Sequence, residues 1–128
     1  MSEEDIMAGL TTGEAQATLD LRFPTTGGTD YIAWSANGTS ETASLARTAI
    51  GATGWAAATA ADPSVKANAV ALTSAGASGA VTVTHFAIYN ASTAGTQRTD
   101  WTALAASKTL AIGDQLTMAI GAVSVTLT

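Results

Sequence analysis

Short apolar runs separated by Gly, Thr, Ser and Asn dominate the chain from residue 25 onward. The runs recur about every ten residues, a spacing typical of antiparallel sandwiches and barrels. We therefore predict an all-β fold for residues 25–128: an antiparallel β-sandwich, either jelly-roll-like or barrel-like. The strands expected before the C-terminal part are residues 29–34, 46–50, 55–59, 67–72 and 80–89.

Residues 80–89 form the strongest strand pattern. Val81 and Val83 alternate with Thr82 and Thr84, which predicts one buried and one wet face. From His85 onward the residues are apolar on both sides. The strand is therefore expected either to be central and covered on both faces, or to carry a bulge near His85 that switches its inward face.

The C-terminal part alternates apolar and polar residues around a Gly-Asp pair. Leu110 and Ile112 precede Gly113-Asp114, and Leu116 and Met118 follow. Glycine at the first central position of a turn is typical of a type II′ hairpin. We predict such a hairpin here, the same device repeated near Gly121, and an antiparallel meander of the last three strands.

The first 24 residues carry the only helical pattern. Ser2 can cap a helix over residues 3–21, the acidic residues that follow suit its positive end, and Phe23-Pro24 ends it. Residues 11–13 can divide this segment into two pieces. We expect residues 1–24 to form a short helix or arm that docks on the domain of residues 25–128 or on a neighbouring subunit; the alternative is a frayed terminus.

Charge is sparse along the chain. Charged residues make up 12%, the formal net charge is −5, and Ala and Thr fill about 40% of the positions. A surface of small, uncharged side chains repels other chains weakly and suits packing into an assembly, although genome base composition offers another explanation. The five Lys and Arg residues are scattered, which argues against nucleic-acid binding.

Targeting signals and disulfides are not expected. The chain has no cysteine, and its acidic start lacks the basic and apolar regions of a signal peptide. No apolar stretch is long enough to cross a bilayer, so no membrane partner is expected. We expect synthesis in the host cytoplasm without a cleaved targeting segment.

The sequence offers no equipment for catalysis. His85 is the single histidine, no Ser lies in a nucleophile motif, and no glycine-rich loop precedes a lysine. We therefore expect no enzyme activity, no catalytic residue, no metal and no cofactor. A calcium site built from loop carboxylates and carbonyls would leave no motif, so that alternative stays open.

The few aromatic residues can fill the core or anchor an interface. Trp55, beside Gly54, and Trp101, after a polar loop, are the candidates for exposure. The apolar residues of the N-terminal arm are further candidates for contact between subunits. The interface candidates are Ile6, Met7, Leu10, Phe23, Trp55 and Trp101.

Three stretches occur in an order and spacing that resemble a known family. They are residues 31–34 with 45–55, residues 83–95 from the histidine strand through its polar loop, and residues 101–127 from Trp101 to the terminal strand. In this order they resemble small virion structural proteins of tailed bacteriophages, labelled minor capsid (decoration) or minor tail proteins. The resemblance covers residues 31–128. The first 24 residues match no part of it.

The resemblance implies a non-enzymatic component of the virion. We take as the main hypothesis a capsid decoration protein on the capsid surface, which binds the major capsid protein as a homotrimer and stabilises the shell. The alternative is a minor tail or tail-fibre component involved in host-surface binding, with Trp55 or Trp101 stacking on glycans. A third possibility, a sugar- or calcium-binding β-module, is weakened by the missing signal peptide.

Overall fold

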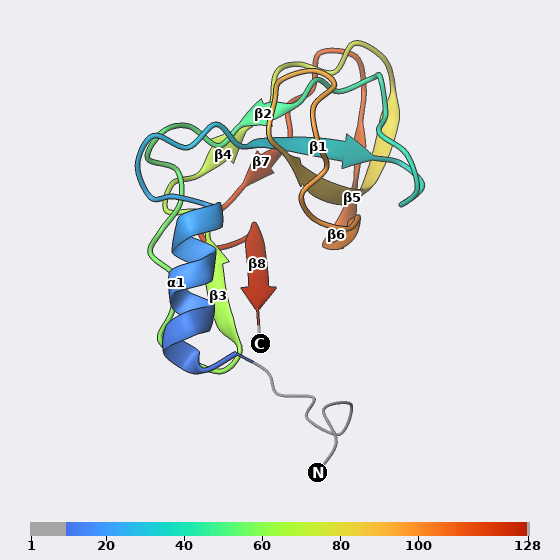
Figure 1. The fold of residues 1–128 in the computed structure, drawn as a ribbon. Helices are drawn as coiled ribbons and strands as arrows, with labels where there is room; N and C mark the ends of the chain where they lie inside the picture. The colour runs from blue at the N-terminus through green and yellow to red at the C-terminus, as the bar shows by residue number, and fades with distance from the viewer. Residues whose placement is uncertain (1–9, 128) are drawn as a thin grey trace.

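The computed structural model describes residues 10–127, and their structure is antiparallel β with one helix (Figure 1). The elements are α1 (Thr12–Arg22), β1 (Tyr31–Ser35), β2 (Thr48–Ala49), β3 (Ser64–Ala67), β4 (Leu72–Thr73), β5 (Val81–Tyr89), β6 (Thr102–Leu110), β7 (Thr117–Met118) and β8 (Ser124–Leu127).

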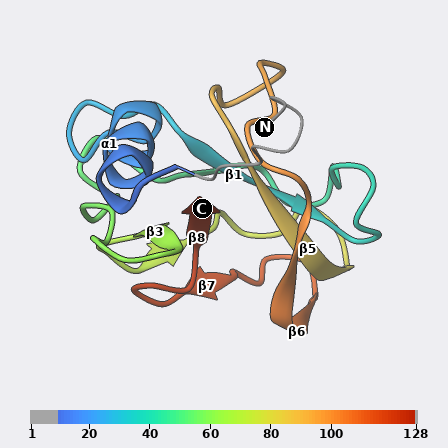
Figure 2. The same ribbon diagram turned by 60° about the horizontal axis from the view of Figure 1, so that its bottom comes forward.

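These strands form one larger sheet and two strand pairs. The four-stranded sheet has the order β2-β1-β5-β6, and β3 pairs with β8 and β4 with β7. All pairs are antiparallel. Figures 1 and 2 show α1 and the β3–β8 pair together on one side of the molecule, away from β5 and β6.

Helix α1 begins at a threonine cap. The Thr11 hydroxyl accepts a hydrogen bond from the Glu14 amide at 3.2 Å, which satisfies one of the free N–H groups of the first turn. Ala15, Leu19 and Phe23 follow at spacings of four residues, so they share the face that enters the core. The described helix therefore starts at Thr12, where the sequence allowed a break, and the predicted part before residue 10 lies outside the described residues.

Strand β5 combines both features that the sequence allowed. It lies between β1 and β6, and Ala87 and Ile88, which point to opposite faces, are both fully buried. Its register with β6 also shifts between Val83 and His85. The central position and the bulge, which the sequence offered as alternatives, therefore occur together.

The predicted C-terminal meander is wrong. Strands β6, β7 and β8 pair with β5, β4 and β3, not with one another. In the turns after β6 and β7, the Asp114 amide donates to the Ala111 carbonyl and the Ala122 amide to the Ala119 carbonyl, both at 3.0 Å. Gly113 (φ +88°) and Gly121 (φ +81°) thus occupy the second central position, as in type II turns. A type II turn does not match the twist of a β-hairpin. The strand after each turn therefore pairs with a strand from elsewhere in the chain, not with the strand before the turn.

The predicted strand at residues 67–72 is replaced by two short strands around a buried asparagine. The Asn68 amide group donates to the carbonyls of Val70 (2.7 Å) and Ala119 (3.0 Å), and its oxygen accepts from the Val123 amide at 3.0 Å. These bonds turn the chain between β3 and β4. The predicted strand at residues 55–59 does not form, although the Ala56 and Thr59 amides donate hydrogen bonds to the carbonyls of Ala67 and Val65 in β3.

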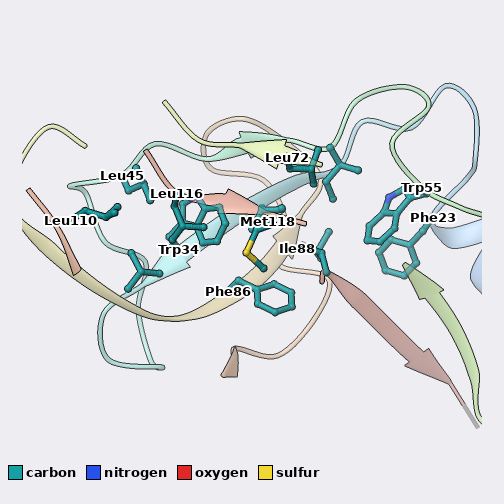
Figure 3. Close-up of a cluster of buried hydrophobic side chains, with 14 of the residues drawn as sticks. Phe23, Trp34, Leu45, Trp55, Leu72, Phe86, Ile88, Leu110, Leu116 and Met118 are labelled. Carbon is teal, nitrogen blue, oxygen red and sulfur yellow. The ribbon is translucent and has the colours of Figure 1, made fainter. Parts of the chain in front are cut away.

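One hydrophobic cluster connects the helix, the four-stranded sheet and the strand pairs. Figure 3 shows Trp34, Phe86, Leu116 and Met118 in its larger part and Phe23 against Trp55 at one end. The all-β antiparallel class is therefore confirmed, whereas the sandwich, jelly-roll and barrel arrangements stay predictions. The division at residue 24 also stays a prediction, although Leu19 and Phe23 belong to the same core as the strands.

A buried carboxylate joins four separate segments near Phe23. Asp30 is 2% exposed and accepts hydrogen bonds from Trp55 Nε1 (3.0 Å) and Arg98 Nη1 (2.5 Å). Arg98 Nη2 donates to the Arg22 carbonyl at the end of α1, and the guanidinium lies 4.3 Å from the Phe23 ring centroid. Asp30 thereby fixes the start of β1, the Trp55 segment, the loop before β6 and, through Arg98, the helix end.

A second ion pair attaches α1 to β3. Lys66 is fully buried, and its Nζ lies 2.7 Å from Asp20 Oδ1, which also accepts from the Ala58 amide at 2.9 Å. The hydrogen bond from Lys66, and secondly that from the Ala58 amide, lower the pKa of Asp20 below its usual value of 3.8. The helix is therefore held to β3 by a charge pair as well as by its apolar face.

Replacing Asp30 by Ala should destabilise the fold strongly. The change leaves the Arg98 guanidinium and the Trp55 indole N–H without their acceptor, and breaking such a pair costs about 3 kcal/mol. Urea unfolding of the variant should report this loss in the free energy of unfolding. Asp100→Ala, at an exposed carboxylate, is the control and should remain within about 0.5 kcal/mol of the parent. A loss equal to that of the control would contradict this role of Asp30.

The Asp20–Lys66 pair should make stability depend on acidity. Because the folded pKa of Asp20 lies below 3.8, the stabilisation is complete above that value and is lost as pH falls through the folded pKa. Thermal unfolding between pH 5 and about pH 2 should show a smaller acid-dependent drop in Tm for Asp20→Asn than for the parent. Equal slopes in the two proteins would show that the pair does not act in this way.

Candidate binding surface

The structure divides the predicted interface residues into surface and core. Phe23 is 5% and Trp55 is 2% exposed, and their rings pack edge-on at 5.4 Å between centroids. Both are core residues held beside Asp30, so the expected exposure of Trp55 is wrong, and a contact of either residue with a partner stays a prediction. Leu10 is exposed and Trp101 half-buried, and their contact with a partner stays a prediction. Ile6 and Met7 lie outside the described residues.

Three half-buried aromatic side chains lie on the outer face of the four-stranded sheet. Tyr31 of β1 stands directly opposite Tyr89 of β5, so their side chains share a face. Trp101, just before β6, packs against Tyr89 with ring centroids 6.3 Å apart and planes tilted by 51°. The inner face of the same strands carries Ile32 and Ile88 into the core. The outer face thus offers an aromatic surface close to solvent.

Arg47 packs on this aromatic surface, over the ring of Tyr89. Its guanidinium carbon lies 3.9 Å from the Tyr89 ring centroid, a cation–π distance. Nε and Nη2 each donate to one oxygen of Glu41 at 2.9 Å, which raises the pKa of Arg47 above its usual value. Nη1 donates to the carbonyls of Ala91 (2.8 Å) and Ala94 (2.7 Å). Arg47 therefore ties the β1–β2 loop to the loop after β5.

The loop after β5 has a fixed shape. Asn90 closes it, because its side-chain oxygen accepts from the Thr96 amide at 2.8 Å and its own amide donates to the Thr96 carbonyl at 3.2 Å. Gly95 has φ +71°, and a Cβ there would lie 2.5 Å from Asn90 Oδ1, so glycine is required. The Tyr89 hydroxyl then donates to Gln97 Oε1 at 3.2 Å. This loop is a preformed rim for the aromatic surface.

A groove runs between β8 and the segment before β6. It has a volume of about 590 Å³ where Leu19, Arg22 and Phe23 face Val125 and Leu127. Gln97 and Arg98 line both this groove and an adjoining hollow of about 530 Å³ beside Asp100. These volumes fall in the range that accommodates a small ligand or a short peptide.

His85 has a packing role on the outer face. Its Nδ1 lies 2.7 Å from the Thr84 hydroxyl, and a Cβ at Gly38 would come within 2.9 Å of the ring, so the loop backbone rests on it. Within residues 10–127, no three acidic or histidine side chains gather as a metal site. Over the same residues, no helix has the length and apolar character required to cross a bilayer.

Sequence patterns missed most of this surface. Trp101 was identified as an interface candidate because it follows a polar loop. The sequence indicated only that Tyr89 belongs to a strand and that Arg47 is one of five scattered cations. The link between Arg47 and the residue 91–94 carbonyls spans more than forty positions. No local spacing signals such a contact, and only the pairing of β1 with β5 brings these residues together.

Comparison with protein families gives one match over most of the chain. Residues 17–126 match the Gp80 family, described as "Podophage GP4 fiber I protein gp80". A comparison with curated proteins finds no match to this chain. The family is one of phage virion structural proteins, which confirms the resemblance noted from the sequence. Because the match covers most of the chain, from the second half of α1 into β8, the chain belongs to the Gp80 family of podophage fibre proteins.

Proposed function

We propose that this protein is a non-enzymatic structural component of a phage tail fibre. The observation that carries the proposal is the family match, since it covers residues 17–126 and its description names a fibre protein. A low charge content and a surface of small side chains support a role in an assembly. The same observations favour the tail-fibre alternative over the capsid decoration hypothesis, for which the major capsid protein as partner stays a prediction.

The aromatic surface is the part best suited to contact a host cell. Trp101 and Tyr89 present ring edges and faces near solvent, beside the polar side chain of Gln97 and the rim formed by residues 90–96. Aromatic rings next to hydrogen-bonding groups suit amphipathic ligands, because one part of the ligand is apolar and another is wet. Sugar rings of host-surface glycans have this character. The fibre would then use this face for adsorption.

The location of the protein in the virion tests the fibre assignment. Immunogold labelling of purified particles should place the protein on the tail. Quantitative mass spectrometry should give a handful to a few dozen copies for each particle. Hundreds of copies, with gold on the head, would instead support a decoration protein, and absence from purified particles would remove the virion role.

Removing the half-buried indole of Trp101 tests the binding role. Trp101→Ala should lower binding to host glycans on an array by about five- to thirtyfold, since losing one stacked aromatic ring costs roughly 1–2 kcal/mol. Ile112→Ala is the matched control, because Ile112 is a large apolar side chain that is 75% exposed on a different turn. Equal binding by the two variants, with unchanged Tm, would exclude Trp101 from the glycan contact.

A further inference from the structure

The outer edge of β8 pairs with no other strand of the described fold. In β3, the carbonyls of Val65 and Ala67 accept from the Thr59 and Ala56 amides, so these residues bond away from β8. Backbone groups alternate along a strand, which leaves Ser64 and Lys66 to bond their partners Leu127 and Val125. The N–H and C=O groups of Ser124 and Thr126 therefore point to the opposite side, where no other described strand pairs with β8.

This unpaired edge lies beside the groove described above. The groove has apolar walls from Leu19, Phe23, Val125 and Leu127, and Arg22 stands at its rim. An edge of free backbone groups beside apolar pockets is the arrangement that accepts an added strand: the backbone supplies hydrogen bonds, and the pockets take alternate side chains. The groove therefore fits an extended peptide segment better than a compact ligand.

Charge identifies the segment that fits. Arg47, Lys66 and Arg98 are paired with Glu41, Asp20 and Asp30. Of the cations within residues 10–127, that leaves Arg22 and Lys108 without an ion pair, and only Arg22 lines the groove. The chain itself has one segment that is acidic and then apolar: Glu3, Glu4 and Asp5 are followed by Ile6 and Met7. This segment matches both the Arg22 rim and the apolar walls.

Strand direction favours the segment of a second copy, and the length of the segment is sufficient for it to reach the groove. Nine residues precede Leu10, enough to span about 30 Å when extended. Helix α1 and β8 run in opposite directions (Figure 1), so a strand that led directly into α1 of its own chain would lie parallel to β8. Every strand pair of the described fold is antiparallel. The segment of a second copy is free to enter in the antiparallel direction.

We propose that residues 3–7 of a second copy add to the free edge of β8 as an antiparallel strand, with the acidic residues near Arg22 and an apolar side chain between Phe23 and Val125. Exchange of these segments links copies of the protein within the fibre. The docked segment completes a third strand beside β3 and β8 and covers the half-buried side chains of Val125 and Leu127. It also gives a defined partner to Arg22.

Disulfide trapping in the full-length chain tests this exchange. The chain has no cysteine, so any disulfide reports an introduced pair. One copy carries Thr126→Cys and a tag; the other carries either Ile6→Cys or Met7→Cys and a different tag. After mixing and mild oxidation, we expect a disulfide-linked dimer with both tags. One of the two neighbouring arm positions should clearly dominate, because adjacent strand residues point to opposite faces.

Charge variants provide the matched control. Arg22→Gln in the Thr126→Cys copy should lower the yield of mixed dimer about threefold, the effect of one partly exposed ion pair. Lys108→Gln removes the same charge away from the groove and should leave the yield unchanged. Equal effects of the two variants would overturn the role of Arg22.

Three other outcomes would overturn the proposal. A disulfide formed only within one chain of a Met7→Cys/Thr126→Cys or Ile6→Cys/Thr126→Cys variant would place the segment on its own groove. Equal trapping at both arm positions would indicate random collision instead of a strand. Absence of any disulfide, in variants whose circular dichroism matches the parent, would leave the groove to a different partner.

Discussion

The fold depends on one buried carboxylate. Asp30 lies where four segments meet that are far apart in the chain, and short strands alone would hold them poorly: β2, β4 and β7 have two residues each. A carboxylate with almost no exposure must be paired to be tolerated, and here it accepts from the Trp55 indole and from Arg98. Arg98 then reaches the end of α1 through the Arg22 carbonyl and stacks on Phe23. Although the chain has few charged residues, three of its five cations thus form ion pairs that stabilise the arrangement of its segments.

Local patterns predicted elements better than their partners. The alternation of Val and Thr before His85 correctly located β5 and its irregularity, and Pro24 correctly ended the helix. The meander was wrong because glycine in a turn can occupy either central position, and its φ value, not its presence, decides whether the strands on either side can pair. The prediction of a strand at residues 67–72 was wrong because the buried Asn68 side chain bonds to the Ala119 carbonyl and the Val123 amide, and these bonds turn the chain. Both partners lie more than fifty residues away in the sequence.

The same limit applies to the candidate surface. Residue type alone marked Trp55 and Trp101 equally, since both tryptophans follow small or polar residues. Burial separates them: Trp55 has an acceptor for its N–H in Asp30 and a ring partner in Phe23, whereas Trp101 packs on Tyr89 at the sheet's outer face. A buried indole requires a hydrogen-bond acceptor, and no pattern within a few residues of Trp55 reveals that Asp30, 25 positions earlier, supplies it.

The aromatic surface and the groove beside β8 share one stretch of chain. Gln97 accepts from the Tyr89 hydroxyl, donates to the Thr99 carbonyl and lines the groove. Asp100 borders the adjoining hollow and directly precedes Trp101. A strand held against β8 therefore touches the segment that positions both aromatic rings. Because ordering a loop before a ligand arrives removes part of the entropic cost of binding, assembly through the groove would favour ligand contact at the aromatic face. In a fibre built from such units, the aromatic surface would be best ordered for binding on those copies whose groove beside β8 is occupied.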